Sequence, residues 1–428
     1  MLKIIQADGS AEQQQIAEMR KRAAETGEGI NAAAEKVLKD VRENGFEAVK
    51  KYSLEFDGAE PREITTEELE EAYRACSDEL IGAMERSAQN IRDYNEKLLQ
   101  KSMEWKNPVG GTVGRLVRGL TRVGIYVPGG TAAYPSSVLM NAVPAKVAGV
   151  GEIVMVTPPT KNLNQSVLAA AKIAGVDRVI AVGGIQAIAA LSYGAGFIPK
   201  VDKICGPGNA YVAAAKRMVY GTIDIDMVAG PSEVLVIADE TSNPKYVAAD
   251  LLSQAEHDVL ASAVLLTTSK ELAQQVDAEI IRQTGYLSRK DIIEQSLANF
   301  GAAIVCPDLA TCAELANEIA PEHLEVCTKN PREVLPMIRN AGAVFLGENA
   351  PEPLGDYLAG PDHVLPTSGT ARFFSPLSVD SFLKTMSVIE YTRDDLRSQW
   401  KDIVTFAQAE FLTAHANSIE VRFEGEQA

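Results

Sequence analysis

The hydrophobic pattern of the chain changes near residue 120. Before that point apolar residues recur at helical spacing, and Thr65-Thr-Glu-Glu68 is a capping box that predicts a helix start. The apolar stripe expected on this long helix comprises Leu69, Tyr73, Cys76, Leu80, Met84, Ile91, Tyr94 and Leu98. We therefore expect the first ~120 residues to be mainly helical, with other elements covering the stripe.

Beyond Arg122 short β-branched runs alternate with Ala-rich helical runs. Strands are predicted at 123–127, 152–157, 178–182, 203–205 and 233–238, and then at 262–266, 303–306 and 343–346. Helices are predicted near 137–149, 165–174, 185–193, 210–219 and 244–257. This alternation is typical of an α/β protein with parallel sheets, and its length favours two α/β units over one large sheet. The tail from about residue 376, with a helical pattern over 396–415, is expected to be a separate small segment.

Composition narrows the class of protein. The 428 residues are 46% hydrophobic and 23% charged, as in an ordinary globular protein, and the net charge of −17 disfavours nucleic-acid or anionic-membrane partners. No run approaches the ~20 apolar residues of a membrane span, and the N-terminal apolar run is too short for a signal peptide. The five cysteines include no C-x-x-C pair, so a disulfide framework is not indicated. We expect a cytoplasmic protein.

Each of the four histidines lies beside a carboxylate or carboxamide. Gln254 and His257 are three residues apart near a predicted helix end, so they share a face and could bind one metal ion. A polar pair at a helix end is the more common explanation of this spacing. Glu410 and His415 are about 140° apart on an unbroken helix, so they share a site only if the helix ends between them.

Two further groups could carry chemistry. Glu322 and His323 follow Pro321, which should end a helix and place the pair in a loop or at a strand start. A carboxylate and an imidazole can divide acid and base work, although a surface turn has the same composition. Asp356 lies in a Gly- and Pro-rich stretch that contains His363 and predicts irregular backbone, where Asp could bind a metal or cap a turn.

Three glycine-containing turns follow predicted strands. They are Pro128-Gly-Gly130, Gly183-Gly-Ile-Gln186 and Gly206-Pro-Gly-Asn209. Turns of this kind bind nucleotides or phosphates through backbone amides, but a tight turn alone also requires glycine. The chain has no G-x-G-x-x-G fingerprint.

In combination these segments resemble the L-histidinol dehydrogenase family over nearly the whole chain. The resemblance is carried by segments 122–130, 182–190, 203–209, 229–233, 250–257, 320–323, 355–357, 363–366 and 412–415. It implies oxidation of L-histidinol to L-histidine through L-histidinal, with reduction of two NAD⁺, as the last step of histidine biosynthesis. It also implies a zinc ion.

The resemblance assigns roles to individual residues. The implied zinc ligands are Gln254, His257, Asp356 and His415, and the implied catalytic pair is Glu322 and His323. The implied substrate contacts are Ser232, Gln254, His257, His323, Asp356, Glu410 and His415, with His363 nearby. The implied cofactor contacts are Tyr126, Gln186 and Asn209. His323 suits proton removal from the alcohol, and Glu322 suits activation of the water that adds to the aldehyde.

The resemblance also implies two incomplete Rossmann-like domains. Residues 1–20 would form an N-terminal arm, and residues 21–125 with 233–375 would form the domain that carries the metal and catalytic residues. Residues 126–232 would carry the NAD site, and residues 376–428 would form a small helical domain exchanged between the chains of a homodimer. In that dimer Glu410 and His415 would complete the partner's site.

Two other classes of function remain open from the residues alone. A zinc hydrolase on an α/β scaffold would use the metal to activate water. A two-lobed protein that binds small molecules without catalysis would use the zinc for structure.

Overall fold

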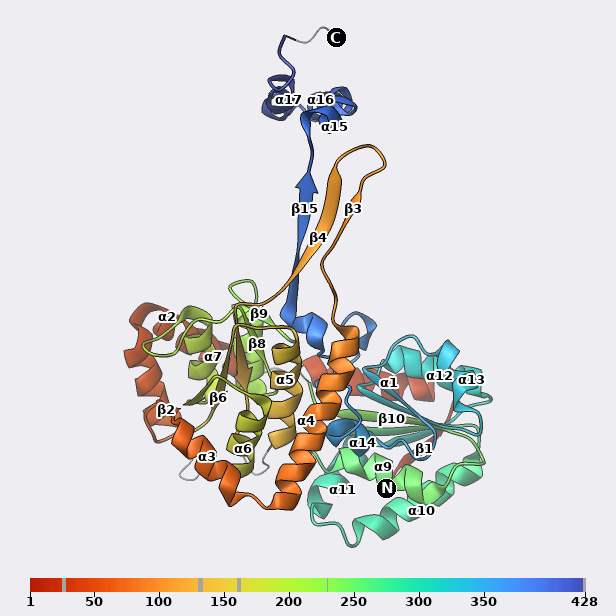
Figure 1. Ribbon diagram of the computed structural model, residues 1–428. Coiled ribbons are helices and arrows are strands. Elements are labelled where there is room, and N and C mark those ends of the chain that lie inside the picture. The colour runs from red at the N-terminus through yellow and green to blue at the C-terminus, as the bar shows by residue number, and fades with distance from the viewer. Residues whose placement is uncertain (25–27, 130–133, 160–162, 229, 426–428) are drawn as a thin grey trace. The chain divides into compact units, whose positions relative to one another are not determined.

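The computed structural model describes residues 1–24, 28–129, 134–159, 163–228 and 230–425 (Figure 1). The chain forms two compact units. The larger unit contains Met1–Leu98 and Leu120–Phe382, and the smaller unit contains Leu99–Gly119 and Leu383–Ala428. Gly130 of the first predicted glycine turn and Ala229 of the family-like segments lie outside the described residues.

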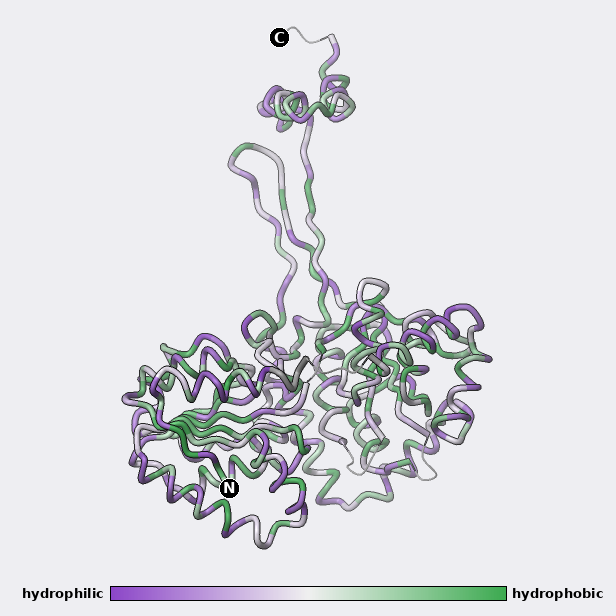
Figure 2. Tube along the Cα trace, turned by 180° about the vertical axis from the view of Figure 1, so that it is seen from behind, coloured by the Kyte–Doolittle hydropathy of each residue, from purple (hydrophilic) through white to green (hydrophobic). Residues whose placement is uncertain are grey.

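The first sheet of the larger unit contains six parallel strands. Their order is β1 (Lys3–Gln6), β12 (Ala302–Val305), β11 (Ser262–Thr267), β10 (Glu233–Ala238), β13 (His323–Cys327) and β14 (Ala343–Leu346). Figure 2 shows these strands as a hydrophobic layer, as expected for a parallel sheet buried on both faces.

Helices cover both faces of this sheet. One apolar cluster joins it to α9 (Pro244–Ala255), α10 (Lys270–Thr284) and α11 (Lys290–Phe300). A second cluster joins its other side chains to α1 (Ala11–Ala24) and α12 (Leu309–Ile319). The short helices α13 (Pro331–Val334) and α14 (Glu352–Tyr357) and the 3-10 turns at 335–337, 370–372 and 379–382 also belong to this unit.

The second sheet of the larger unit also has six strands. Their order is β2 (Arg62–Ile64), β7 (Arg178–Ala181), β6 (Glu152–Thr157), β5 (Arg122–Tyr126), β8 (Lys203–Cys205) and β9 (Asp224–Ile225), and only β2 runs antiparallel to its neighbour. The helices α2 (Glu28–Phe56), α7 (Gly184–Tyr193) and α8 (Ala210–Val219) share one apolar cluster with it. The helices α3 (Thr66–Ala75), α4 (Asp78–Leu98), α5 (Pro135–Val147) and α6 (Gln165–Ala174) pack against one another, and α5 contacts β5.

The two parallel-dominated sheets confirm the predicted α/β class and the expectation of more than one sheet, and all eight predicted strands are present. The predicted capping box is also present. The Thr65 hydroxyl accepts from the Glu68 N–H, and the Glu68 carboxylate accepts from the Thr65 N–H. The long helix that follows was predicted incorrectly. It breaks after Ala75 and restarts at Asp78, which shifts the helical register, so Ile81 is buried whereas Leu80 is exposed.

The grouping of the N-terminal residues differs from the expected one. We expected 21–125 to join 233–375, but β2 pairs with β7, and α2 packs against α7 of the second sheet. Within the expected arm, β1 pairs with β12 as the edge strand of the first sheet. The apolar faces of these helices carry no signal in the sequence that indicates which sheet they cover.

The smaller unit is built on a three-stranded antiparallel sheet. Its order is β15 (Leu383–Glu390), β4 (Thr112–Gly119) and β3 (Met103–Lys106), and it is followed by α15 (Arg393–Arg397), α16 (Trp400–Ala409) and α17 (Thr413–Glu420). We expected a helical pattern over 396–415 and a separate segment from about residue 376. The strands β3, β4 and β15 were not predicted. In this unit Val404, Ala407 and Ala416 form a small apolar cluster.

Within the described ranges, no helix combines the length and the apolar character needed to cross a membrane.

Candidate active site

A cavity of about 420 Å³ lies between the two sheets of the larger unit. The residues that border it precede or begin β10 and β13 in the first sheet and follow β5 and β8 in the second. The predicted site residues that line it are Asn209, Ser232, Gln254, His257, Glu322, His323, Asp356 and His363. The amino edge of one sheet therefore faces the carboxyl edge of the other, and ligands of open α/β sheets usually bind at the carboxyl edge.

The Glu322 and His323 pair lies where the sequence predicted it. Helix α12 ends at Ile319, Ala320 adopts a left-handed conformation with φ 53°, and β13 begins at His323. Glu322 Oε2 accepts a hydrogen bond from the Glu233 N–H at 2.9 Å, and His323 Nδ1 lies 3.0 Å from the Glu233 carbonyl oxygen. One residue of the neighbouring strand thus holds both side chains.

These contacts determine which nitrogen of His323 is free. A carbonyl oxygen only accepts, so Nδ1 carries the proton and Nε2 keeps its lone pair. Among the described residues Nε2 has no hydrogen-bond partner, and its closest carboxylate contact is Glu352 Oε1 at 3.9 Å. Burial lowers the pKa of His323 to about 4, against an opposing effect of Asp356. The imidazole is therefore neutral near pH 7 and can accept a proton at Nε2.

Glu322 has the opposite shift. Burial raises the pKa of its carboxyl well above the ordinary value, the Glu233 N–H lowers it, and the negative charges of Glu233 and Asp356 raise it further. A higher pKa makes the carboxylate a stronger base once it has lost its proton.

Gln254 and His257 lie at the end of α9, on the wall of the cavity. Gln254 is buried, and its Oε1 has no hydrogen-bond partner among the described residues. The His257 N–H donates to the Gln254 carbonyl oxygen at 3.1 Å, and the exposed His257 side chain also lines the cavity. A buried carbonyl oxygen without a donor is costly in an apolar setting, and a cation would satisfy it.

Asp356 lies in the six-residue helix α14, whereas irregular backbone was expected. Proline in the first helical turn is compatible with a helix start, which explains why this Pro-rich stretch forms one. Asp356 Oδ1 lies 3.6 Å from His363 Nδ1. Burial raises the pKa of Asp356, but His363 outweighs it and lowers the pKa below the ordinary value. Burial lowers the pKa of His363, but Asp356 raises it overall, so the shifts of both groups favour an ion pair between them.

Glu352, which the sequence reasoning missed, adds another carboxyl one helical turn before Asp356. Burial, followed by the charge of Asp356, raises the pKa of Glu352 to about 8. One possible ligand atom from each of Glu352, Asp356 and His323 lies within 4.8 Å of the others. Oxygen and nitrogen ligands in an acidic pocket, together with the unpartnered Gln254 oxygen, fit a divalent cation such as zinc. The four-residue spacing of Glu352 and Asp356 places both on one face only in a helix, and irregular backbone was predicted here.

The three residues expected to contact the cofactor do not lie together in the cavity. Asn209 lines it and caps α8 by accepting from the backbone N–H groups of Tyr211 and Val212, each at 3.1 Å. Tyr126 and Gln186 are buried and do not line it. The Tyr126 hydroxyl accepts from the Gly184 N–H at 3.2 Å, and Gln186 Nε2 donates to a carboxylate oxygen of Asp57 at 2.9 Å.

The glycine turn after β8 is closely packed. Gly206 has φ 107°, and a Cβ atom there would lie 2.1 Å from the Tyr126 carbonyl oxygen, so the turn requires glycine. Lys216 Nζ donates to the Gly206 carbonyl oxygen at 2.8 Å and forms a buried ion pair with Asp226, which accepts from the Gly206 N–H at 2.7 Å. These bonds fix a backbone that borders the cavity.

Glu410 and His415 belong to the smaller unit, where both are exposed. Helix α16 ends at Ala409, Phe411 has a positive φ of 59°, and α17 begins at Thr413. The helix therefore ends just before Glu410, so Glu410 and His415 do not lie on one unbroken helix, which is the condition under which the sequence allowed them to share a site.

Comparison with known proteins identifies relatives over the whole chain. A family model described as histidinol dehydrogenase matches residues 20–423. Histidinol dehydrogenase of Clostridium acetobutylicum is 53% identical over 429 residues, 99% of each chain. The protein of that name from Caldanaerobacter subterraneus subsp. tengcongensis is 55% identical over 400 residues, 92% of this chain and 93% of its own.

The fold comparison agrees with the sequence comparison. The crystal structure of histidinol dehydrogenase from Elizabethkingia anophelis superimposes with a TM-score of 0.93 at 37% identity, covering 98% of each chain. Together, the family model and these relatives show that the chain belongs to the histidinol dehydrogenase family.

Proposed function

We propose that this chain is a zinc-dependent dehydrogenase that oxidises L-histidinol to L-histidine through L-histidinal. The reaction would reduce two NAD⁺ at the last step of histidine biosynthesis, in the cytoplasm. The observation that carries the proposal is the convergence on one cavity of a neutral imidazole base, a carboxyl base and an unpartnered ligand oxygen. Family membership supplies the substrate.

In the first oxidation His323 is the proton acceptor for the alcohol. Its Nδ1–H is held by the Glu233 carbonyl oxygen at 3.0 Å, which fixes both the tautomer and the direction of Nε2. The hydroxyl of a bound amino alcohol would lose its proton to Nε2 as hydride leaves the carbinol carbon. Because His323 is buried and neutral, it accepts this proton without first having to lose another.

In the second oxidation Glu322 activates water. An aldehyde must add water before a second hydride can leave, and a base must take a proton from that water. Glu322 Oε2 is oriented by the Glu233 N–H at 2.9 Å, and burial raises the basicity of the carboxylate. Glu322 and His323 line the same cavity, so the two bases would act on one bound substrate.

Gln254, His257 and Asp356 would hold the zinc ion, together with His415 of the partner subunit. The donor set fits this ion, because it offers a buried unpartnered amide oxygen, an accessible imidazole and an acidic carboxylate. When bound, the metal would serve chiefly as a template for the imidazole and amino nitrogens of the substrate. The bases of this chain would therefore carry the proton transfers.

Tyr126, Gln186 and Asn209 would contribute to the cofactor site at the carboxyl edge of the second sheet. Asn209 lines the cavity beside the constrained Gly206 turn, and Gln186 Oε1 has no hydrogen-bond partner within the described part of the chain. NAD⁺ would supply the hydride acceptor for both oxidations. The chain's own contribution is a rigid turn that borders the cavity.

We also propose a homodimer with shared active sites, in which residues 376–428 are exchanged. The smaller unit leaves large apolar side chains in solvent, with Phe411 90%, Ile389 74% and Phe406 72% exposed. Its own apolar cluster is small. Exposed apolar surface of this kind marks an interaction site, and a second copy of the chain would cover it. Glu410 and His415 of the partner subunit would then complete the substrate site.

Absorbance at the NADH wavelength tests the activity. Metal-loaded protein mixed with L-histidinol and NAD⁺ should form about two NADH per histidinol consumed, and chelator-treated protein is the control. A zinc hydrolase, or a binding protein with structural zinc, would form no NADH. Absence of NADH from metal-loaded dimer would therefore reject the proposed function.

A further inference from the structure

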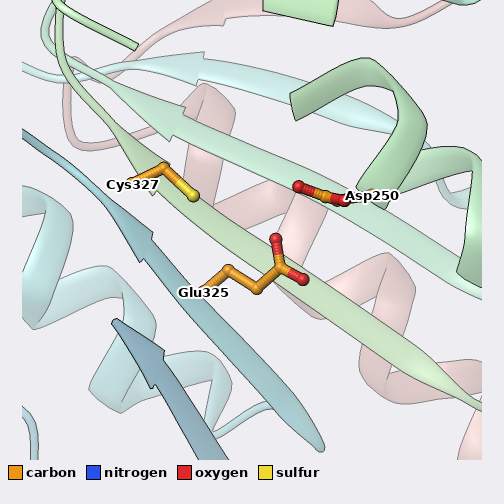
Figure 3. A group of neighbouring side chains, drawn as sticks. All are labelled: Asp250, Glu325 and Cys327. Atoms are coloured by element: carbon orange, nitrogen blue, oxygen red, sulfur yellow. The ribbon is translucent and has the colours of Figure 1, made fainter. Parts of the chain in front are cut away.

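A second acidic group is buried outside the lining of the cavity. Asp250 of α9 and Glu325 and Cys327 of β13 are buried, and one possible ligand atom from each lies within 4.8 Å of the others. Figure 3 shows the two carboxyl groups directed toward each other, with the Cys327 sulfur close by. No step of the proposed reaction uses these groups.

The positions of the two carboxyls follow from the local structure. Alternate residues of a strand point to the same face, so Glu325 lies on the face of β13 that also carries His323. Helix α9 covers this face, because its Leu251 shares an apolar cluster with Cys327. Asp250 lies one helical turn before Gln254. The pair therefore joins the helix with the proposed metal ligands to the strand with the proposed base.

Glu325 also anchors a third element of the site. Its Oε1 accepts a hydrogen bond at 2.8 Å from the backbone N–H of Glu352, the first residue of α14. That helix carries Asp356 one turn later. One buried carboxyl therefore contacts the elements that present Gln254, His323 and Asp356.

The remaining oxygen of Glu325 needs a donor. Oε2 is buried and has no conventional donor among the described residues. Two buried carboxyls this close cannot both ionise, and a proton held between them satisfies both. Burial and then the charge of Asp250 raise the pKa of Glu325, and burial raises the pKa of Asp250, which agrees with a retained proton.

We propose that Asp250 and Glu325 share a proton in a buried hydrogen bond that joins α9, β13 and α14 and so positions Gln254, His323 and Asp356. The two carboxyls are positioning residues and touch neither substrate nor cofactor. The activity measurement for this inference rests on the proposed function. Metal retention tests the positioning role without relying on that activity.

The test compares replacements that keep or remove the hydrogen bonds. In Glu325→Gln the amide oxygen still accepts from Glu352 and the amide nitrogen donates to Asp250, so metal retention and activity should stay within about threefold of wild type. Glu325→Leu, of similar size, removes both bonds. It should weaken metal retention against a chelator, and lower kcat/KM for L-histidinol, by about 10- to 100-fold, the usual effect of groups that orient metal ligands.

Several results would overturn the proposal. Folded Glu325→Leu that matches wild type would show that the bonds position nothing. Glu325→Gln as impaired as Glu325→Leu would show that a full negative charge is needed. Two metal ions per wild-type chain, falling to one in Glu325→Gln, would make this group a metal site instead.

A second variant covers the case in which Glu325→Leu does not fold. Asp250→Asn with Glu325→Gln replaces the pair by two amides, which can still hydrogen bond, so this double variant should retain metal and activity. Loss of metal retention in the folded double variant would refute the shared-proton bond. If wild type forms no NADH, the proposed function fails, while metal retention in the same variants still decides the positioning role.

Discussion

Asp362 provides a sharp test of how burial controls the electrostatics beside the site. Its side chain is 4% exposed, one oxygen accepts from the Val364 N–H at 2.8 Å, and the other has no partner among the described residues. Burial, against the opposing effect of His363, raises the pKa of Asp362 to about 8. The folded chain therefore holds a proton there that the unfolded chain has lost above about pH 4.

The sign and size of the effect follow from this difference. The unfolded state binds fewer protons, so the free energy of unfolding of the wild type falls as pH rises from about 4 to about 8. Asp362→Asn removes this titration but keeps an acceptor for the Val364 N–H. Its new amide donor has a constant cost, whereas the wild-type penalty grows by about 1.4 kcal/mol per pH unit. The variant should therefore gain about 4 kcal/mol relative to wild type between pH 5 and pH 8.

Urea unfolding of both proteins at pH 5, 6, 7 and 8 measures this gain. Asp291→Asn, which removes one negative charge from an exposed position of α11, controls for the change in net charge. A difference between wild type and Asp362→Asn that is the same at all four pH values would refute the reasoning, because it would show that Asp362 titrates alike in both states.

Three further outcomes are expected from the proposed function. His257→Asn should lose metal and activity together. Its metal affinity should fall by more than the ~10- to 100-fold that is typical when a residue supporting a metal ligand is changed. Full metal content in an inactive variant would give His257 another role. Glu322→Gln should slow oxidation of supplied L-histidinal by about 10²- to 10⁴-fold and slow the alcohol step less, whereas equal slowing of both would reject the division of labour. His415→Ala and His323→Ala chains should each be inactive, but a refolded mixture should recover about a quarter of wild-type activity, because half of the dimers have one intact site. No recovery despite demonstrated subunit exchange would contradict the shared site.

The parts of the fold that the sequence predicted are those in which burial of apolar side chains dominates. Strands such as β6 and β10 are uninterrupted apolar runs, because helices bury both of their faces. At β13 the sequence left a loop and a strand start both open, because His323 and Glu325 interrupt its apolar residues. His323 belongs to the candidate site and Glu325 to its proposed support, and functional positions are where a local sequence pattern and the fold often disagree.

The grouping of the site residues was predicted from the family resemblance, and local spacing alone suggested only pairs such as Gln254 with His257. Gln254 and His257 lie at one helix end and share the cavity wall. Glu352 was missed because its role comes from burial beside Asp356 and His323, which depends on tertiary structure. Strands β3, β4 and β15 were missed because their largely exposed, mixed side chains carry no clear period-2 pattern.

The order of pairing in the smaller unit has a consequence for the protein during its synthesis. Strand β4 pairs with β15, and Asn107 donates to the Tyr391 hydroxyl at 3.1 Å across 284 positions of sequence. At about 5–20 residues per second, a ribosome needs roughly 15–60 s to make the intervening chain. Throughout that time β3 and β4 form at most a two-stranded hairpin, which is marginally stable, with an open edge and the exposed Trp105 side chain. The segment that contains β3 and β4 is therefore vulnerable to misassociation during synthesis. This exposure ends only when β15, within the last 50 or so residues, emerges.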